Sequence, residues 1–258
     1  MELHLKKPAH IPSQRLNLGQ LADRFHGEMI PIGTRFRYVC AAVSLSEEDL
    51  REYLDEPVAA LPPVIAAQLP EIRILLVPYL EKGDPPSART KDEPLMSTEK
   101  PQEARALSFG SLVTGSGAVF AFAVKDAGVA DYHYRLYHGI AGLVAGKHGK
   151  LVPDGYLALI REELRKGAHG EVDDAAWRLK VDLEEKDRRG ARPTKRFRDY
   201  ALQSYVDTLT LYMHGICCDI DVETGPRQLP SNLLRKRLKF LCDTFPPPQG
   251  YAVFPEDL

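Results

Sequence analysis

The order of the hydrophobic patterns is the feature that most constrains how this chain folds. Strand-like runs, rich in β-branched and aromatic residues, occur between residues 35 and 125, whereas the periodic segments after Asp131 have helical spacing. Strands followed by helices, rather than alternating with them, are typical of an α+β fold. We therefore predict a single α+β domain over residues 1–258, in which a small mixed β-sheet of the N-terminal half packs with a helical C-terminal half.

A strand–helix–strand unit is predicted first. Residues 35–45 and 71–79 have the composition of strands, and Ser46 is followed by acidic residues that suit the first turn of a helix. Pro57 and the Pro62–Pro63 pair are expected to cut that helix into pieces, because proline lacks the backbone N–H that a helix interior needs.

A hairpin completes the predicted sheet of about four strands. Residues 105–113 and 118–125 are strand-like, and the glycines between them can supply the positive φ angles of a tight turn. The segment 81–104 is rich in proline and charge without any period, so we predict a mobile loop there. The sheet-containing part thus spans 35–125.

The C-terminal part, residues 131–242, is predicted to be helical. Glycine and proline residues separate its periodic segments and mark where each helix ends. The expected helices cover residues 132–146, 155–166, 173–189, 195–216 and 231–242.

Composition excludes several classes of protein. The formal net charge of -2 produces no overall field toward nucleic acid or anionic lipid, so such a partner would need a local patch. The longest apolar run, residues 118–124, is far shorter than the roughly 20 residues of a membrane-spanning helix. We therefore expect no membrane association. The first 16 residues also lack the apolar core of a signal peptide, so we expect no export by that route.

The four cysteines predict a reducing compartment. Cys40, Cys217, Cys218 and Cys242 include no C-x-x-C pair and no pattern of a secreted disulfide framework, so we predict a cytoplasmic protein. No phosphate-binding glycine loop, dinucleotide fingerprint or nucleophile elbow occurs, and no cofactor is predicted.

The segment His138-Gly139-Ile140-Ala141-Gly142 resembles the H-E-x-x-H helix of the zincin metalloproteases. His138 keeps the first ligand position, whereas Gly139 and Gly142 replace the catalytic glutamate and the second histidine. Glu162 lies near the spacing at which gluzincins place a third ligand. The resemblance covers about residues 35–165 and implies a degenerate hydrolase in which His138 and Glu162 remain as site residues.

A packing role explains the same glycines, and we favour it. Gly139, Gly142 and Gly146 are three and four residues apart, so they form a bare stripe where another backbone can approach closely. His138, at the edge of this stripe, is then the one plausible reactive group.

The helix predicted at 195–216 supplies two further candidate catalytic residues. An apolar face is opposed by a polar stripe that includes Asp207 and His214, two turns apart. We expect this stripe to face solvent; alternatively, the two residues line a cleft as a carboxylate and a general base. Any pocket should then lie between this helix and the glycine-striped helix and bring His138 toward Glu162, Asp207 or His214.

An acidic segment follows that helix. Asp219, Asp221 and Glu223 alternate and would project to one side of an extended chain, as oxygen ligands of Mg²⁺ or Ca²⁺ do. The spacing does not fit a calcium-binding EF-hand loop, so we predict a solvated acidic turn, with a weak metal site as the alternative.

Basic residues gather in two places that could contact phosphates. One is 235–239, and the other comprises Arg188, Arg189, Arg192, Lys195, Arg196 and Arg198 together with neighbouring lysine. We expect solvated helix ends here, with nucleic-acid backbone binding as the alternative.

Each catalytic constellation considered lacks at least one necessary member. We therefore favour a non-catalytic binding or assembly module, with a protein partner possible. A hydrolase, either degenerate zincin-like or metal-dependent, is the first alternative, and a nucleic-acid backbone binder is the second; whether the chain is an enzyme stays open.

Overall fold

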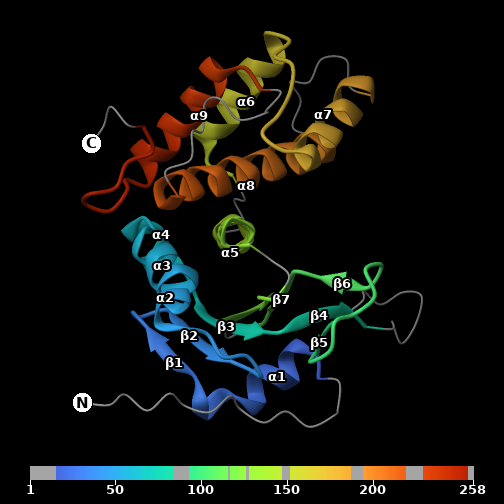
Figure 1. Cartoon of the computed structure of the whole chain (residues 1–258). Coiled ribbons are helices and arrows are strands. Elements are labelled where there is room, and N and C mark those ends of the chain that lie inside the picture. Colours follow the sequence, from blue (N-terminus) through green and yellow to red (C-terminus); the bar gives the residue numbers. More distant parts are fainter. Residues whose placement is uncertain are drawn as a thin grey trace. The chain divides into compact units, whose positions relative to one another are not determined.

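The computed structural model describes residues 16–83, 93–115, 117–125, 128–146, 152–186, 194–218 and 229–254 (Figure 1). Its contacts divide the chain into two compact units. Unit 1 comprises Met1–Val58 and Leu69–Arg135, and unit 2 comprises Ala59–Gln68 and Leu136–Leu258. The predicted α+β class is confirmed, because a mixed sheet precedes a run of helices along the chain. The single domain stays a prediction.

Five of the described strands form the main sheet of unit 1. In spatial order they are β1 (Ile30–Ile32), β2 (Phe36–Cys40), β3 (Glu71–Val77), β8 (Gly117–Ala123) and β7 (Phe109–Val113). The inner strands β2, β3 and β8 are parallel, and the two outer strands are antiparallel to their neighbours. Both the predicted strand–helix–strand unit and the predicted hairpin are therefore confirmed.

Alternation along the strands builds two buried faces on this sheet. Val39, Val77 and Val119 pack on one face with helix α1 (Leu18–Arg24), which precedes the short 3-10 helix η1 (His26–Glu28). Phe122 lies on the other face, where its ring centroid is 4.3 Å from that of Tyr132. Every residue of β8 is buried, as expected for an inner parallel strand.

A second, smaller sheet corrects the prediction of a mobile loop at 81–104. β5 (Pro94–Ser97), β4 (Tyr79–Lys82) and β6 (Ala106–Leu107) pair in the order β5-β4-β6. Met96 of β5 is buried opposite Leu80 of β4. The prediction weighed local composition alone, whereas β4 offers a neighbouring ladder that local composition does not reveal. Residues 84–92 lie outside the described part of the chain.

The helical segment after β2 begins as the sequence predicts. Ser46 caps α2 (Glu47–Leu50) in a reciprocal capping box with Asp49. The helix then continues through the π-helical turn η2 (Arg51–Asp55) into α3 (Glu56–Ala59), so the predicted break at Pro57 is wrong. A break does occur at Pro62, before α4 (Pro63–Gln68), which belongs to unit 2.

The π-turn has a physical cause in Pro57. The Glu56 N–H donates to the Arg51 carbonyl, five residues back, and Pro57 has no N–H to donate to the Glu52 carbonyl. Widening the turn by one residue thus accommodates proline within the helix and leaves the Glu52 carbonyl available to a side chain.

Long helices dominate the rest of the chain. α5 (Val129–Gly146) begins in unit 1 and continues into unit 2, followed by α6 (Asp154–Arg165), α7 (Asp174–Lys186), α8 (Lys195–Cys218) and α9 (Ser231–Thr244). The described residues after Asp131 include no strand, which agrees with the predicted helical part. In the portion of the chain that the structure describes, none of the helices has the length and apolar character needed to cross a membrane.

The glycine stripe of α5 does not act as a close-packing surface at two of its three positions. Gly142 and Gly146 are exposed, and a Cβ atom added at either would meet nothing within 4 Å. Helical spacing correctly placed these glycines on one side of the helix, but it could not reveal that this side faces away from the core.

Candidate functional site

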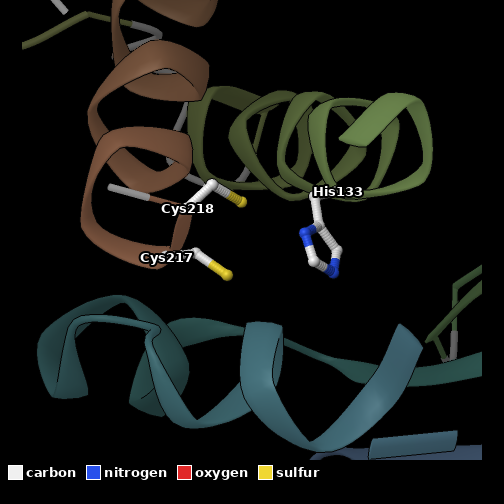
Figure 2. Close-up of side chains that lie close together, drawn as sticks. All are labelled: His133, Cys217 and Cys218. Carbon is white, nitrogen blue, oxygen red and sulfur yellow. The ribbon is translucent and has the colours of Figure 1, made fainter. Parts of the chain in front are cut away.

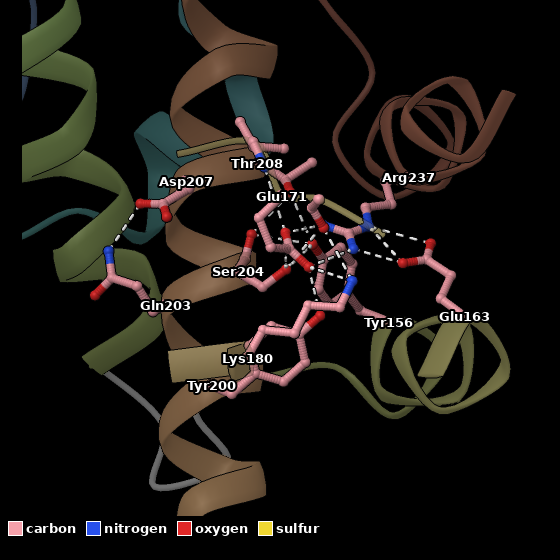
Figure 3. Close-up of polar contacts among 12 residues, drawn as sticks. Tyr156, Glu163, Glu171, Lys180, Tyr200, Gln203, Ser204, Asp207, Thr208 and Arg237 are labelled. Carbon is pink, nitrogen blue, oxygen red and sulfur yellow. Dashed lines mark hydrogen bonds and ion pairs between the residues drawn. The ribbon is translucent and has the colours of Figure 1, made fainter. Parts of the chain in front are cut away.

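Unit 2 buries a cluster of charged side chains around Arg237 of α9 (Figure 3). The guanidinium is fully buried and forms bidentate contacts with two carboxylates. Arg237 Nε lies 3.1 Å from each carboxylate oxygen of Glu163, whereas Nη1 and Nη2 lie 2.8 and 3.0 Å from Oε2 and Oε1 of Glu171. Ser204 Oγ accepts a further hydrogen bond from Nη1 at 2.9 Å.

Two more side chains stabilise the ionised form of Glu171, one by its charge and one by a hydrogen bond. Lys180 Nζ lies 3.7 Å from Glu171 Oε1 and donates to the Gly170 carbonyl at 2.9 Å, while the Tyr200 hydroxyl donates to Glu171. Burial alone would raise the pKa of Glu171, but the charges of Arg237 and Lys180 and hydrogen bonds from Arg237 and Tyr200 lower it. Two cations thus face two carboxylates, and the cluster is charge-balanced.

The Arg237 cluster joins four helices and the segment before α7. Glu163 comes from α6, Lys180 from α7, Ser204 from α8 and Arg237 from α9. Because the donors of Arg237 are engaged by these partners, the cluster is suited to holding helices in register rather than to transferring a proton.

Arg237 corrects one sequence prediction. The run 235–239 was expected to be solvated or to contact phosphates, yet its central arginine is 0% exposed. Leu234, Leu238 and Leu241 are buried on the same helix, and Arg237 lies among them at three- and four-residue spacing. That spacing is the signal in the sequence that places Arg237 on the buried side of α9, although its charge favours solvent.

Asp207 of α8 is a third buried carboxyl group among the described residues of this unit, and it has few partners. It is 1% exposed, and Gln203 Nε2 donates to its Oδ1 at 2.8 Å (Figure 3). Among the residues that the structure describes, its Oδ2 has no hydrogen-bond partner. Burial raises the pKa of Asp207 to about 7, and the charges of Asp173 and Glu171 add to this, whereas Gln203 and the Ala176 amide act oppositely.

The polar stripe of α8 was predicted to face solvent, and for most of its length this prediction is wrong. Asp207, Thr210 and His214 are all buried, while Asp199 near the start of the helix is exposed. The His214 ring centroid lies 6.2 Å from that of Tyr137 of α5. A pocket that brings His138 toward Glu162, Asp207 or His214 stays a prediction.

The other two predicted catalytic candidates, His138 and Glu162, also belong to unit 2. His138 is half-buried on α5. Glu162 of α6 is partly exposed and pairs with Lys166 at 2.5 Å, and the hydrogen bond and charge of that lysine lower the pKa of the carboxyl group. The structure thus directs Glu162 to Lys166 and buries Asp207 and His214 along one helix.

Two predicted sites fall partly or wholly outside the described residues. The acidic candidates Asp219, Asp221 and Glu223 lie there, as do three of the basic residues, Arg188, Arg189 and Arg192. Lys195, Arg196 and Arg198 are described and exposed at the start of α8, where Arg196 Nε lies 3.1 Å from Asp182 Oδ2.

Unit 1 contains a buried histidine near its π-turn. His133 of α5, drawn in Figure 2, is 5% exposed. Its Nε2 donates to the Glu52 carbonyl at 2.7 Å. Burial lowers the pKa of His133, although the Glu52 carbonyl and the nearby charges of Glu56 and Glu52 oppose this. The imidazole thus satisfies the carbonyl that Pro57 leaves open. Cys217 and Cys218, in the last turn of α8, belong to unit 2 and are half-buried.

The edge strand β7 exposes backbone groups on its outer side. Two backbone hydrogen bonds mark the ends of its ladder with β8. Thr114 N donates to Gly117 O at 2.8 Å, and Ala123 N donates to Ser108 O at 3.1 Å. Hydrogen-bonded pairs alternate with non-bonded pairs in an antiparallel ladder. The N–H and C=O groups of Gly110 and Leu112 therefore also point toward β8. The backbone N–H and C=O groups of Phe109, Ser111 and Val113 therefore point outward, where no described residue forms a hydrogen bond with them.

The opposite edge of the same sheet is protected. β1 has only three residues, and its middle residue Pro31 has no N–H to offer. β7 has five residues, none of them proline or charged, and Val113 on it is 63% exposed. Of the two edges, β7 is thus the one at which another strand can pair.

Comparisons of this chain with protein-family models, with curated proteins and with solved structures yield no match.

Proposed function

We propose that this chain is a cytoplasmic binding or assembly module that does not act by catalysis. The observation that carries the proposal is the open edge of β7. The outward N–H and C=O groups of three alternate residues there have no partner among the described residues. Natural sheets usually block or cover such edges, and open ones bind extended segments of other chains.

The placement of the ionisable groups supports the proposal. The four charged side chains of the Arg237 cluster neutralise one another, and Glu162 is paired with Lys166. Burial raises the pKa of the Cys40 thiol to about 11, so this cysteine is poorly suited to be a nucleophile near neutral pH. These groups serve folding better than they serve acid–base or nucleophilic chemistry.

A hydrolase is the second candidate, and Asp207 is the observation that favours it. A buried carboxyl group with a pKa of about 7 is poised to exchange a proton near neutral pH, as general acids and bases are. His214 lies two turns along the same buried side of α8.

Assays of the purified chain on simple ester, amide and phosphate-ester substrates, with and without added divalent metal, separate the two candidates. The binding module predicts no turnover above buffer. Turnover that disappears in Asp207→Asn or His214→Ala, while the exposed Asp199→Asn retains it, would contradict the proposal. Stoichiometric metal in protein purified without added zinc, lost in His138→Ala, would likewise favour the hydrolase.

Nucleic-acid backbone binding is the remaining alternative from the sequence. Its described basic residues are exposed at the start of α8, but Arg196 is already paired with Asp182. Binding to a duplex of arbitrary sequence that weakens steeply with salt would support this alternative. The binding-module proposal predicts no such binding at low salt.

A further inference from the structure

The outward groups of β7 are arranged symmetrically. Phe109, Ser111 and Val113 are spaced two residues apart, with Ser111 at the centre. An antiparallel copy of the same strand with Ser111 opposite Ser111 would set each Phe109 opposite Val113 of the other chain. Each of the three opposed pairs can then exchange both of its N–H to C=O bonds, because every member already points outward.

We propose that β7 pairs with β7 of a second copy of this chain, antiparallel and centred on Ser111, so that the two main sheets become one. This inference rests on the proposed function, because it names the partner of the binding or assembly module. Pairing of this kind is isologous: the same surface serves both subunits, and a two-fold axis passes between the two serines.

The side chains of the strand fit this partner. Ser111 is exposed, and Val113 is 63% exposed at the end of the strand. Phe109 is half-buried, with its ring centroid 5.0 Å from that of Phe122 on the neighbouring strand. In the paired arrangement, Val113 of each chain lies beside Phe109 of the other, an aromatic–aliphatic cross-strand contact that removes exposed apolar surface from water.

Charge also favours a second copy over a charged partner segment. Residues 109–113 include no charged side chain, so two identical strands approach one another without repulsion within the strand. The protected edge at β1 cannot extend the sheet in the same way, so the assembly stops at a dimer rather than continuing as a fibre.

The test is sedimentation velocity of the full chain over a concentration series. Wild type is expected to shift with concentration from the 28.8 kDa monomer toward twice that mass. Ser111→Lys places two like charges across the two-fold axis and should raise the dissociation constant about fivefold or more. Ile30→Lys makes the same kind of change on the β1 edge, where Ile30 is 41% exposed, and should leave the dissociation constant unchanged.

A mixed sample provides the decisive control. Ser111→Glu alone should dissociate like Ser111→Lys, whereas an equimolar mixture of the two variants should form a dimer again, because opposite charges then face each other. A folding defect cannot produce that rescue. Amide hydrogen exchange of the peptide containing residues 109–113 should slow in the dimer and remain fast in Ser111→Lys.

Two results overturn the proposal. One is a wild-type chain that remains monomeric at every concentration, and the other is a dimer that Ser111→Lys does not weaken. A monomer without hydrolytic activity removes the self-pairing alone, whereas turnover lost in Asp207→Asn removes the proposed function, so the two failures are distinguishable.

Discussion

Glu171 and Asp207 are both buried carboxyl groups of unit 2, yet their pKa values shift in opposite directions. Burial penalises the ionised form of each. Glu171 receives hydrogen bonds from Arg237 and Tyr200 and lies near Lys180, so its pKa falls. Asp207 accepts a side-chain bond from the neutral Gln203, and its pKa rises to about 7. Charged partners, rather than burial, therefore decide the protonation state of these side chains.

The two carboxyl groups also make opposite contributions to stability as pH changes. Glu171 has a lowered pKa in the folded state, so its contribution is present above the ordinary pKa and is lost as pH falls through the folded value. Asp207 has a raised pKa, so its contribution is fully present below the ordinary value of 3.8 and is lost as pH rises through about 7.

The largest expected effect comes from removing Arg237, the cation that Glu163 and Glu171 share. Arg237→Ala leaves Glu163 and Glu171 buried with one cation between them, and should lower the free energy of unfolding by about 3–5 kcal/mol near neutral pH. Urea denaturation followed by circular dichroism measures this difference. Lys239→Ala is the matched control on the same helix, because its ion pair with Asp243 is exposed. Equal losses in the two variants would contradict the role assigned to the cluster.

The next effect concerns Asp207, whose hydrogen-bonding side-chain partner is the neutral Gln203, and it depends on pH. Asp207→Asn removes the ionisable group while keeping a similar shape, so the variant should gain stability relative to wild type as pH rises from about 4 to 7. The gain should reach a plateau on the order of 2–4 kcal/mol above pH 7. Urea titrations across this range provide the measurement, with the exposed Asp199→Asn as control. Parallel pH profiles for wild type and Asp207→Asn would show that Asp207 is not held protonated.

A smaller effect is expected when Glu171 loses one hydrogen-bond donor, because its pKa should then shift in the direction seen for Asp207. Tyr200→Phe removes one hydrogen bond to the carboxylate of Glu171 and should cost about 2 kcal/mol at neutral pH. The same change should raise the pKa of Glu171, so acid unfolding should begin at a higher pH. Tyr251→Phe, at a tyrosine that is 36% exposed, serves as the control for loss of a phenol. An unchanged acid transition in Tyr200→Phe would assign the low pKa of Glu171 to the cations alone.

Local sequence patterns were sufficient for much of the fold. The cap at Ser46, the parallel unit around it, the hairpin at 105–125 and the buried face of α8 all follow from side-chain period, turn residues and capping residues, which act over a few positions. Pro57 and the segment 81–104 were the failures. A π-turn accommodated the proline, and the strand β4 supplied a partner for β5, and neither compensation is visible in local composition.

The sequence by itself determined where the five helices after Asp131 lie and that Asp207 and His214 share one side of their helix. Only the tertiary structure decided what those faces meet. Arg237 is 74 residues from Glu163 and 66 from Glu171, so no pattern of helical period could join them. The open side of β7 is likewise a property of strand order, because a strand has an unpaired edge only when no other strand is hydrogen-bonded to it. Periodicity is a property of neighbours along the chain, whereas charge compensation and sheet edges depend on neighbours in space.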